Sequence, residues 1–141
     1  AVRIGPDWRF LVVAKPGYFG RRSAPAHPGE LTNHQCINLR LASAGGLYAW
    51  EFEKNGRELD VRVGGQLTCN SIMMVLHAAV DGHGLAFVPE DLARPFIQAG
   101  QLRTVLEDWC PTIQGYHLYY PNRRHASPAF ARFVETLRYR G

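Results

Sequence analysis

The sequence predicts an α/β fold, and three local patterns support this prediction. Residues 70–89 combine a capped helix, a glycine stop and a short apolar strand. Residues 9–14 contain the run Phe-Leu-Val-Val, which is typical of a buried strand, and Pro16-Gly17 ends it. Between residues 50 and 63, two segments of alternating apolar and polar residues flank Asn55-Gly56. This dipeptide is a strong hairpin signal, because both central residues of the turn must tolerate positive φ.

The segment 70–89 is the most informative part of the chain. Asn70 or Ser71 can accept a hydrogen bond from the first unpaired N–H groups of a helix. Apolar residues then recur at helical spacing, so one face of this helix should pack inward. They are Ile72, Val75, Leu76, Ala79 and Val80. Gly82 suits the left-handed residue after a helix, and Gly84 allows a tight turn into a strand at 85–88. We expect that uncharged strand inside a sheet covered by helices.

The other elements follow in chain order. The stretch from Tyr18 to Gly29 is rich in Gly, Pro, Ser and Arg and predicts a loop, and a short helix is expected to start at 28–31. A second short strand is expected at 36–39, followed by a loop of small residues at 42–46.

The last third of the chain predicts two helices and two strands. After Pro89 we expect a short helix that Pro95 interrupts, because proline lacks the N–H that an interior helical residue donates. Strands are expected at 102–106 and 116–120. A final helix should begin at the Ser127 cap and carry an apolar stripe through Phe130, Phe133, Val134 and Leu137.

Composition indicates a globular chain of one compact domain or two small lobes. It has 141 residues, of which 46% are hydrophobic, and three cysteines. An odd number of widely spaced cysteines favours a reducing cytoplasm over a disulfide framework. No apolar run approaches the roughly 20 residues that a membrane-spanning helix needs, so we expect a cytoplasmic protein without a membrane partner.

The net charge of +4 is unevenly distributed along the chain. Residues 1–25 and 121–141 each hold five basic residues against one acidic residue, whereas residues 26–120 hold six basic against ten acidic. One interpretation is ordinary solvated surface charge. The other is two lobes, a basic one built from both chain ends and an acidic one built from the middle. Neither implies sequence-specific DNA reading, since no aromatic-interleaved basic motif and no zinc spacing is present.

Residues that could bind a metal or act as a nucleophile are scattered along the chain. Each cysteine has a histidine nearby in sequence, which raises the alternatives of a metal site or a Cys–His nucleophile. The pairs are Cys36 with His34, Cys69 with His77 and Cys110 with His117. No spacing matches a zinc site, so buried structural thiols are the favoured interpretation, and we expect no metal, no cofactor and no enzymatic activity.

A second group of residues suggests recognition of an anion. Asn70 and Ser71 would present free amides and small polar side chains where a helix begins, which suits a carboxylate. Arg40 follows a predicted strand next to the small-residue loop that contains Ser43, and could form a bidentate bond with an acidic ligand. A surface or interlobe salt bridge is the alternative role for Arg40, and simple turn chemistry is the alternative for the loop.

Several short segments, taken in the order in which they occur along the chain, resemble the effector-binding domain of LysR-type transcriptional regulators. They cover nearly the whole chain and are Val12–Phe19, Pro28–Leu31, His34–Arg40, Gly45–Phe52, Gly65–Leu67 with Asn70-Ser71, Gly82–Pro89, Gly100–Leu102 with Val105-Leu106, and Leu118–Pro121 with Ser127–Phe130.

The resemblance implies a type 2 periplasmic-binding-protein-like fold, with two lobes joined by crossing strands and lobe I incomplete in this chain. Residues 1–15 would be a remnant of lobe I, residues 16–115 lobe II, and residues 116–141 the return strand and C-terminal helix of lobe I. The first half of lobe I and the N-terminal winged helix-turn-helix of the family have no counterpart among these residues.

The resemblance also implies a function. A small, anionic organic effector would bind between the lobes and change the geometry of a DNA-bound homodimer or tetramer. The expected effector-binding residues are Arg40, Leu41, Ser43, Asn70, Ser71 and Tyr18. DNA would be contacted only through the N-terminal module. The alternatives are a solute-binding transport protein or a dehydratase-like enzyme of the same fold.

Overall fold

The structure is a computed structural model that describes residues 2–3, 7–20, 22–41, 46–113 and 117–118. The chain divides into two compact units, one made of residues 1–8 and 112–141 and the other of residues 9–111. In the smaller unit, β1 (Val2–Arg3) pairs antiparallel with β9 (His117–Leu118), which confirms the centre of the strand expected at 116–120. The expected helix after Ser127 lies outside the described residues.

A three-stranded antiparallel sheet in the order β7-β2-β8 is the centre of the larger unit. Its strands are β2 (Phe10–Ala14), β7 (Ala86–Pro89) and β8 (Arg103–Val105). Residues 11–14 are buried because β2 is paired on both sides.

The division of the chain into lobes at residue 15 stays a prediction. That division assigns β2 to lobe I, whereas β2 belongs here to the larger unit. The strand expected at 85–88 has partners on both sides, because β7 pairs with β2 and Leu85 forms a parallel bridge with Cys36.

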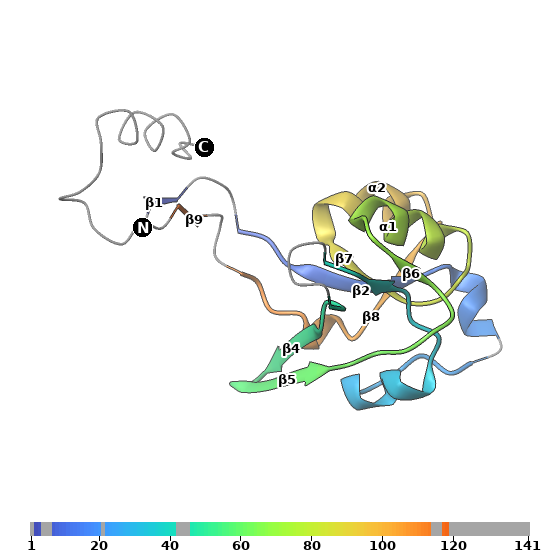
Figure 1. Ribbon diagram of the computed structural model, residues 1–141, viewed down its shortest axis with the longest axis horizontal. Helices are drawn as coiled ribbons and strands as arrows, with labels where there is room; N and C mark the ends of the chain where they lie inside the picture. The colour runs from blue at the N-terminus through green and yellow to red at the C-terminus, as the bar shows by residue number, and fades with distance from the viewer. Residues whose placement is uncertain (1, 4–6, 21, 42–45, 114–116, 119–141) are drawn as a thin grey trace. The chain divides into compact units, whose positions relative to one another are not determined.

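Two helices lie side by side and contact this sheet (Figure 1). Helix α1 (Ile72–Val80) contacts β2 and β7, and it buries Val75, Leu76 and Ala79, as the helical spacing predicts. Helix α2 (Glu90–Gln98) continues through Pro95, so the expected interruption there is wrong. Pro95 is exposed and its ring faces solvent, and the helix loses a single backbone bond while the Ala99 N–H still donates to the Pro95 carbonyl at 3.1 Å.

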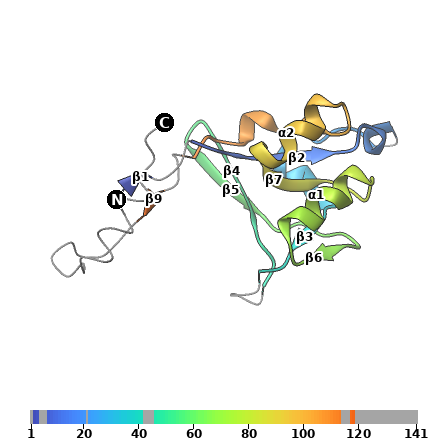
Figure 2. The same cartoon turned by 90° about the horizontal axis from the view of Figure 1, so that it is seen from above.

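A short parallel pair lies beside α1 (Figure 2). It consists of β3 (Asn38–Leu39) and β6 (Thr68–Cys69). The strand expected at 36–39 is confirmed, because Cys36 also forms a parallel bridge with Leu85 just before β7. Two 3-10 helices precede it. Helix η1 (Pro16–Gly20) occupies the start of the stretch expected to be a loop, and η2 (Pro28–Asn33) is the short helix expected there.

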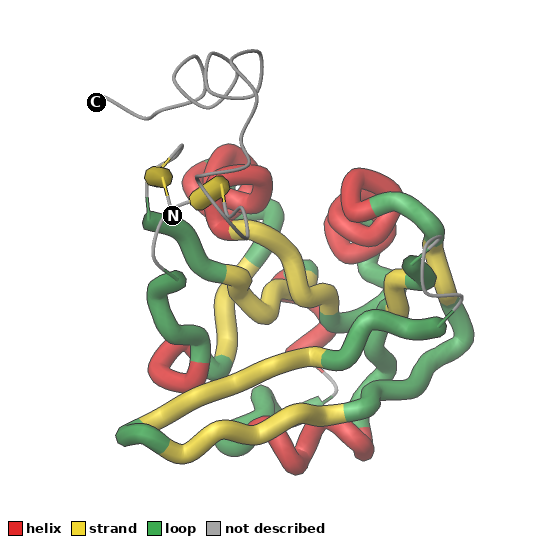
Figure 3. Tube along the Cα trace, turned by 60° about the vertical axis from the view of Figure 1, so that its left-hand side comes forward, coloured by secondary structure: helices red, strands yellow, loops and turns green. Residues whose placement is uncertain are grey.

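The predicted hairpin is confirmed and consists of β4 (Trp50–Lys54) and β5 (Arg57–Val61) (Figure 3). Asn55 and Gly56 form its turn with φ of 53° and 79°, the left-handed conformation that the dipeptide predicts. Trp50 and Phe52 are buried against Phe87 of β7, with ring centroids 5.4 and 5.3 Å away. The aromatic contacts attach the hairpin to the sheet. The last element of this unit, η3 (Glu107–Trp109), contacts β4.

Candidate functional site

The carboxyl ends of β3 and β6 form the first candidate site. Because the two strands are parallel, with Leu39 opposite Cys69, the residues that follow them meet at one edge. The backbone N–H of Arg40 donates to the Cys69 carbonyl at 2.8 Å. Below this edge the buried Asn38 side chain donates to the Val63 carbonyl at 3.0 Å, which fixes the strand that carries Arg40.

Helix α1 begins at the same edge. Ser71 is its N-cap, and the Ser71 hydroxyl accepts a hydrogen bond from the Met74 N–H at 3.4 Å. The first turn of any α-helix carries N–H groups without an intrahelical acceptor, together with the positive end of the helix dipole. Asn70 is exposed beside this cap, so a carboxylate could approach the first turn next to Arg40.

The loop after Arg40 is closed by backbone pairing. The Leu41 N–H donates to the Gly46 carbonyl at 2.9 Å, and Arg40 forms a bridge with Leu47. The Tyr48 N–H then donates to the Leu39 carbonyl at 2.8 Å. These contacts place Leu41 beside the edge, whereas Ser43 lies outside the described residues.

Tyr18 does not lie at this edge and instead contacts His34 and Gln35. Its hydroxyl accepts a hydrogen bond from the Gln35 N–H at 3.2 Å and lies 2.7 Å from Nδ1 of His34. Which of the two groups donates in the Tyr18–His34 hydrogen bond depends on the tautomer of the His34 ring, because a hydroxyl can accept two hydrogen bonds. Burial lowers the pKa of His34 and the Arg22 charge lowers it further, while burial raises the pKa of the Tyr18 hydroxyl. Gln35 and Arg40 are separated by five residues of extended chain, or about 16 Å.

The structure therefore brings together four of the six residues expected from the sequence. They are Arg40, Leu41, Asn70 and Ser71. Tyr18 lies at the amino end of the same strand segment, with its hydroxyl engaged by His34 and Gln35.

Sequence reasoning missed a pocket of about 480 Å³ at that amino end. It is lined by Arg22, Gln35, Gln66, Leu67 and His83. The polar residues come from four separate segments, and no periodicity or motif connects them. The one local signal was His83 between Gly82 and Gly84, and the sequence analysis interpreted this segment only as a turn.

The cysteines do not form a nucleophilic site among the described residues. Cys36, Cys69 and Cys110 are free thiols and all three are buried, as the favoured interpretation predicted. Burial raises the pKa of Cys36 to about 12 and that of Cys110 to about 11. Within the described ranges, no group of three His, Cys, Asp or Glu residues is arranged to hold a metal ion.

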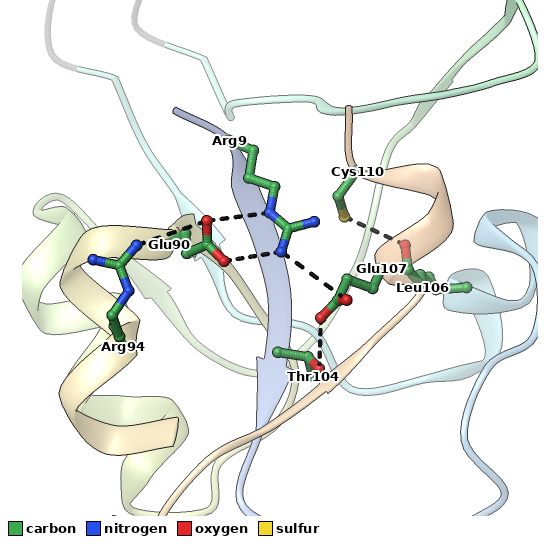
Figure 4. Close-up of polar contacts among 7 residues, drawn as sticks. All are labelled: Arg9, Glu90, Arg94, Thr104, Leu106, Glu107 and Cys110. Carbon is green, nitrogen blue, oxygen red and sulfur yellow. Dashed lines mark hydrogen bonds and ion pairs between the residues drawn. The ribbon is translucent and has the colours of Figure 1, made fainter. Parts of the chain in front are cut away.

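An ion cluster lies where β2 begins (Figure 4). Arg9 donates from Nε and Nη2 to the two carboxylate oxygens of Glu90, at 3.2 and 2.9 Å, and Nη2 lies 4.0 Å from Glu107. Arg94 lies 3.8 Å from Glu90 along α2. The hydrogen bond from Arg9 holds the pKa of the Glu90 carboxyl below its usual range. The bidentate contact ties β2 to the start of α2, so its role is structural.

Comparison with known proteins identifies the family to which this chain belongs. The model of the LysR substrate binding domain matches residues 1–141, and the chain belongs to this family. Its fold is accordingly that of type 2 periplasmic-binding proteins. Among the part of the chain that the structure describes, no helix is long and apolar enough to cross a membrane.

Individual relatives support the same assignment. The chain is 50% identical over 139 residues to a putative transcriptional regulator of Pseudomonas aeruginosa, covering 99% of this chain and 45% of that protein. It is 46% identical over 141 residues to the HTH-type transcriptional regulator PgrR of Escherichia coli, covering 100% and 47%. The chain thus spans about half the length of these relatives. Their names point to a regulatory rather than a catalytic role.

A solved structure shows the same fold. The full-length Vibrio cholerae virulence activator AphB, described as a member of the LTTR protein family, matches with a TM-score of 0.69 at 26% identity. The match covers 96% of this chain and 45% of AphB.

Proposed function

We propose that this domain is the effector-sensing part of a transcriptional regulator and that a small organic anion binds at the carboxyl ends of β3 and β6. The single observation that carries the proposal is the meeting of Arg40 with the capped start of α1 at one sheet edge. The proposed ligand-binding residues are Arg40, Leu41, Ser43, Asn70 and Ser71. Tyr18 is left out because its hydroxyl already serves His34 and Gln35.

The chemistry of this edge favours a carboxylate. A guanidinium offers charge-assisted, bidentate hydrogen bonds to a carboxylate. The amides of the first helical turn add donors aligned with the positive end of the dipole, a contribution of about 0.3–1 kcal/mol. Both groups are carried by backbone that is hydrogen-bonded into β3 and β6, so ligand binding would not need to order that backbone first.

The proposal includes two macromolecular partners. One is a second copy of the chain, in a homodimer or tetramer. The second copy is supported by two exposed apolar side chains on α1, Met73 and Met74, which are 41% and 55% exposed. Exposed apolar side chains that lie together are typical of surfaces that contact another protein. The other partner is DNA, contacted by a helix-turn-helix module outside these 141 residues, as the names of longer relatives suggest. Such a regulator would act in the cytoplasm.

Titration with carboxylates of known structure tests the ligand site. We would add acetate, succinate and benzoate to the ¹⁵N-labelled chain and follow the backbone amides of Arg40, Leu41 and residues 70–73. The expected result is saturable shifts there, with affinity reduced about tenfold by Arg40→Gln through loss of a charge-assisted contact. Arg62→Gln, at an exposed position outside this edge, is the matched control. Saturable binding with shifts elsewhere, or equal effects of both variants, would refute the placement.

A further inference from the structure

The pocket at the amino ends of β3 and β6 has a rigid backbone frame. The Ile37 N–H donates to the Leu85 carbonyl at 2.8 Å, and the Leu85 N–H donates to the Gln35 carbonyl at 2.9 Å. On the other side, the Asn38 N–H donates to the Leu67 carbonyl at 3.1 Å. Gln35, Leu67 and the segment before Leu85 therefore hold fixed positions around the pocket of about 480 Å³.

Two glycines allow these segments to approach so closely. A Cβ atom at Gly84 would overlap the Gln35 carbonyl oxygen, and one at Gly65 would overlap the Cys36 carbonyl oxygen. Each glycine directly precedes or follows a lining residue, since His83 comes before Gly84 and Gln66 comes after Gly65. The close approach sets the position of the backbone next to both lining residues.

The lining favours a negatively charged ligand. Of the described residues that line the pocket, none is a carboxylate, and Leu67 is the apolar member. Arg22 supplies a guanidinium with five donors, of which one nitrogen donates to the Asn33 carbonyl at 3.2 Å, and the group also interacts with the Tyr18 hydroxyl. His83 adds a ring that donates hydrogen bonds, and the amides of Gln35 and Gln66 supply further donors.

We propose that this pocket binds a small oxyanion, presenting a carboxylate or a phosphate group, as a second ligand site of the domain. Arg22 and His83 pair with the oxygens, and the Gln35 and Gln66 amides complete the contacts. The site is independent of the proposed effector edge, because Gln35 and Arg40 lie about 16 Å apart along the same extended segment.

A titration with inorganic phosphate and, separately, with succinate tests this site on the 141-residue chain. The readout is the set of amide shifts in ¹H–¹⁵N spectra, together with the Nε–H signal of Arg22. We expect saturable shifts at Gln35, Gln66, Leu67 and His83. The probe that binds more tightly identifies whether a phosphate or a carboxylate is preferred.

Variants decide whether the shifts report the proposed contacts. Arg22→Gln should weaken binding about tenfold, the effect of losing about 1.4 kcal/mol. Arg57→Gln, at an exposed position beside the hairpin turn, should leave the affinity unchanged. If Arg22→Gln disturbs the loop, His83→Gln and Gln66→Ala give the same test from other walls of the pocket.

Three results would overturn the proposal. They are shifts that grow without saturation, an affinity that none of the pocket variants changes, and saturable shifts confined to Arg40 and residues 70–73. The last result would leave the proposed effector site intact, so the two proposals fail separately.

Discussion

Replacement of Gly84 by alanine is expected to destabilise the larger unit by about 1–6 kcal/mol. Gly84 has φ of +145°, and holding a residue with a side chain in such a sparsely populated conformation costs about 1–3 kcal/mol. The new Cβ would also overlap the Gln35 carbonyl oxygen, which accepts the Leu85 N–H at 2.9 Å. Overpacking of this kind costs about 1–3 kcal/mol. Alanine also reduces the conformational freedom of the unfolded chain, which offsets about 0.4–1 kcal/mol of this destabilisation.

Alanine substitutions at three other glycines measure the backbone strain and the steric overlap separately. Gly56 has φ of +79° with open space around it, so Gly56→Ala should cost about 1–2 kcal/mol from backbone strain alone. Gly65→Ala should cost about 1–3 kcal/mol from overlap with the Cys36 backbone. Gly17 meets neither obstacle, so Gly17→Ala should stay within about 0.5 kcal/mol of the parent.

Urea unfolding, followed by circular dichroism and tryptophan fluorescence, gives the free energy of unfolding for each variant. The order of destabilisation should place Gly84→Ala first and Gly17→Ala last. If Gly84→Ala unfolds at the same free energy as Gly17→Ala, then the close approach of residues 84 and 35 is not a feature of the folded protein. That result would also remove the frame argued for the amino-end pocket.

Other predictions concern single contacts. Arg9→Gln should lower the free energy of unfolding by about 1 kcal/mol at pH 7, because the pair is bidentate and both side chains are partly buried, with exposures of 26% and 30%. Since the folded state depresses the pKa of Glu90, this stabilisation is full above the ordinary carboxyl value of 4.5 and is lost as pH falls through the folded pKa. A difference between parent and variant that is the same at pH 3 and pH 7 would contradict this assignment. Tyr18→Phe should cost about 1 kcal/mol in urea unfolding through the lost bond to His34, and an unchanged midpoint would count against that bond. Cys36 should react with iodoacetamide far more slowly in the native chain than in urea, since a pKa of about 12 leaves roughly one thiolate in ten thousand at pH 8, and equal rates would show that the thiol is accessible.

Local chemistry in the sequence was sufficient for several elements. Asn55-Gly56 specifies the hairpin turn because few other dipeptides accept two positive φ values. Ser71 and Gly82 mark the two ends of α1 for similarly local reasons, a side-chain acceptor at one end and positive φ at the other. These features depend on neighbours within four residues, which the sequence displays directly.

Features that depend on distant partners were not predictable in the same way. Pro95 was expected to interrupt a short helix, but the contacts of α2 with β2 and β7 outweigh one lost backbone bond. The strand before Pro89 has the uncharged sequence of an interior strand, and part of its burial comes from Trp50 and Phe52 of the hairpin. A side chain that covers a strand from outside the sheet leaves no trace in the strand's own sequence.

Strand polarity explains why sequence reasoning found one candidate site and missed the other. At the carboxyl ends of β3 and β6, the polar residues are consecutive with the strands, since Arg40 follows β3 and Asn70 follows β6. At the amino ends, Gln35 and Gln66 also precede their strands, but Arg22 belongs to a loop and His83 to the turn after α1. Their proximity is produced by backbone bonds between residues about 50 positions apart, such as the one from Leu85 to Gln35. The same parallel pair therefore presents donors at both ends, and the strand segment 35–40 physically connects them.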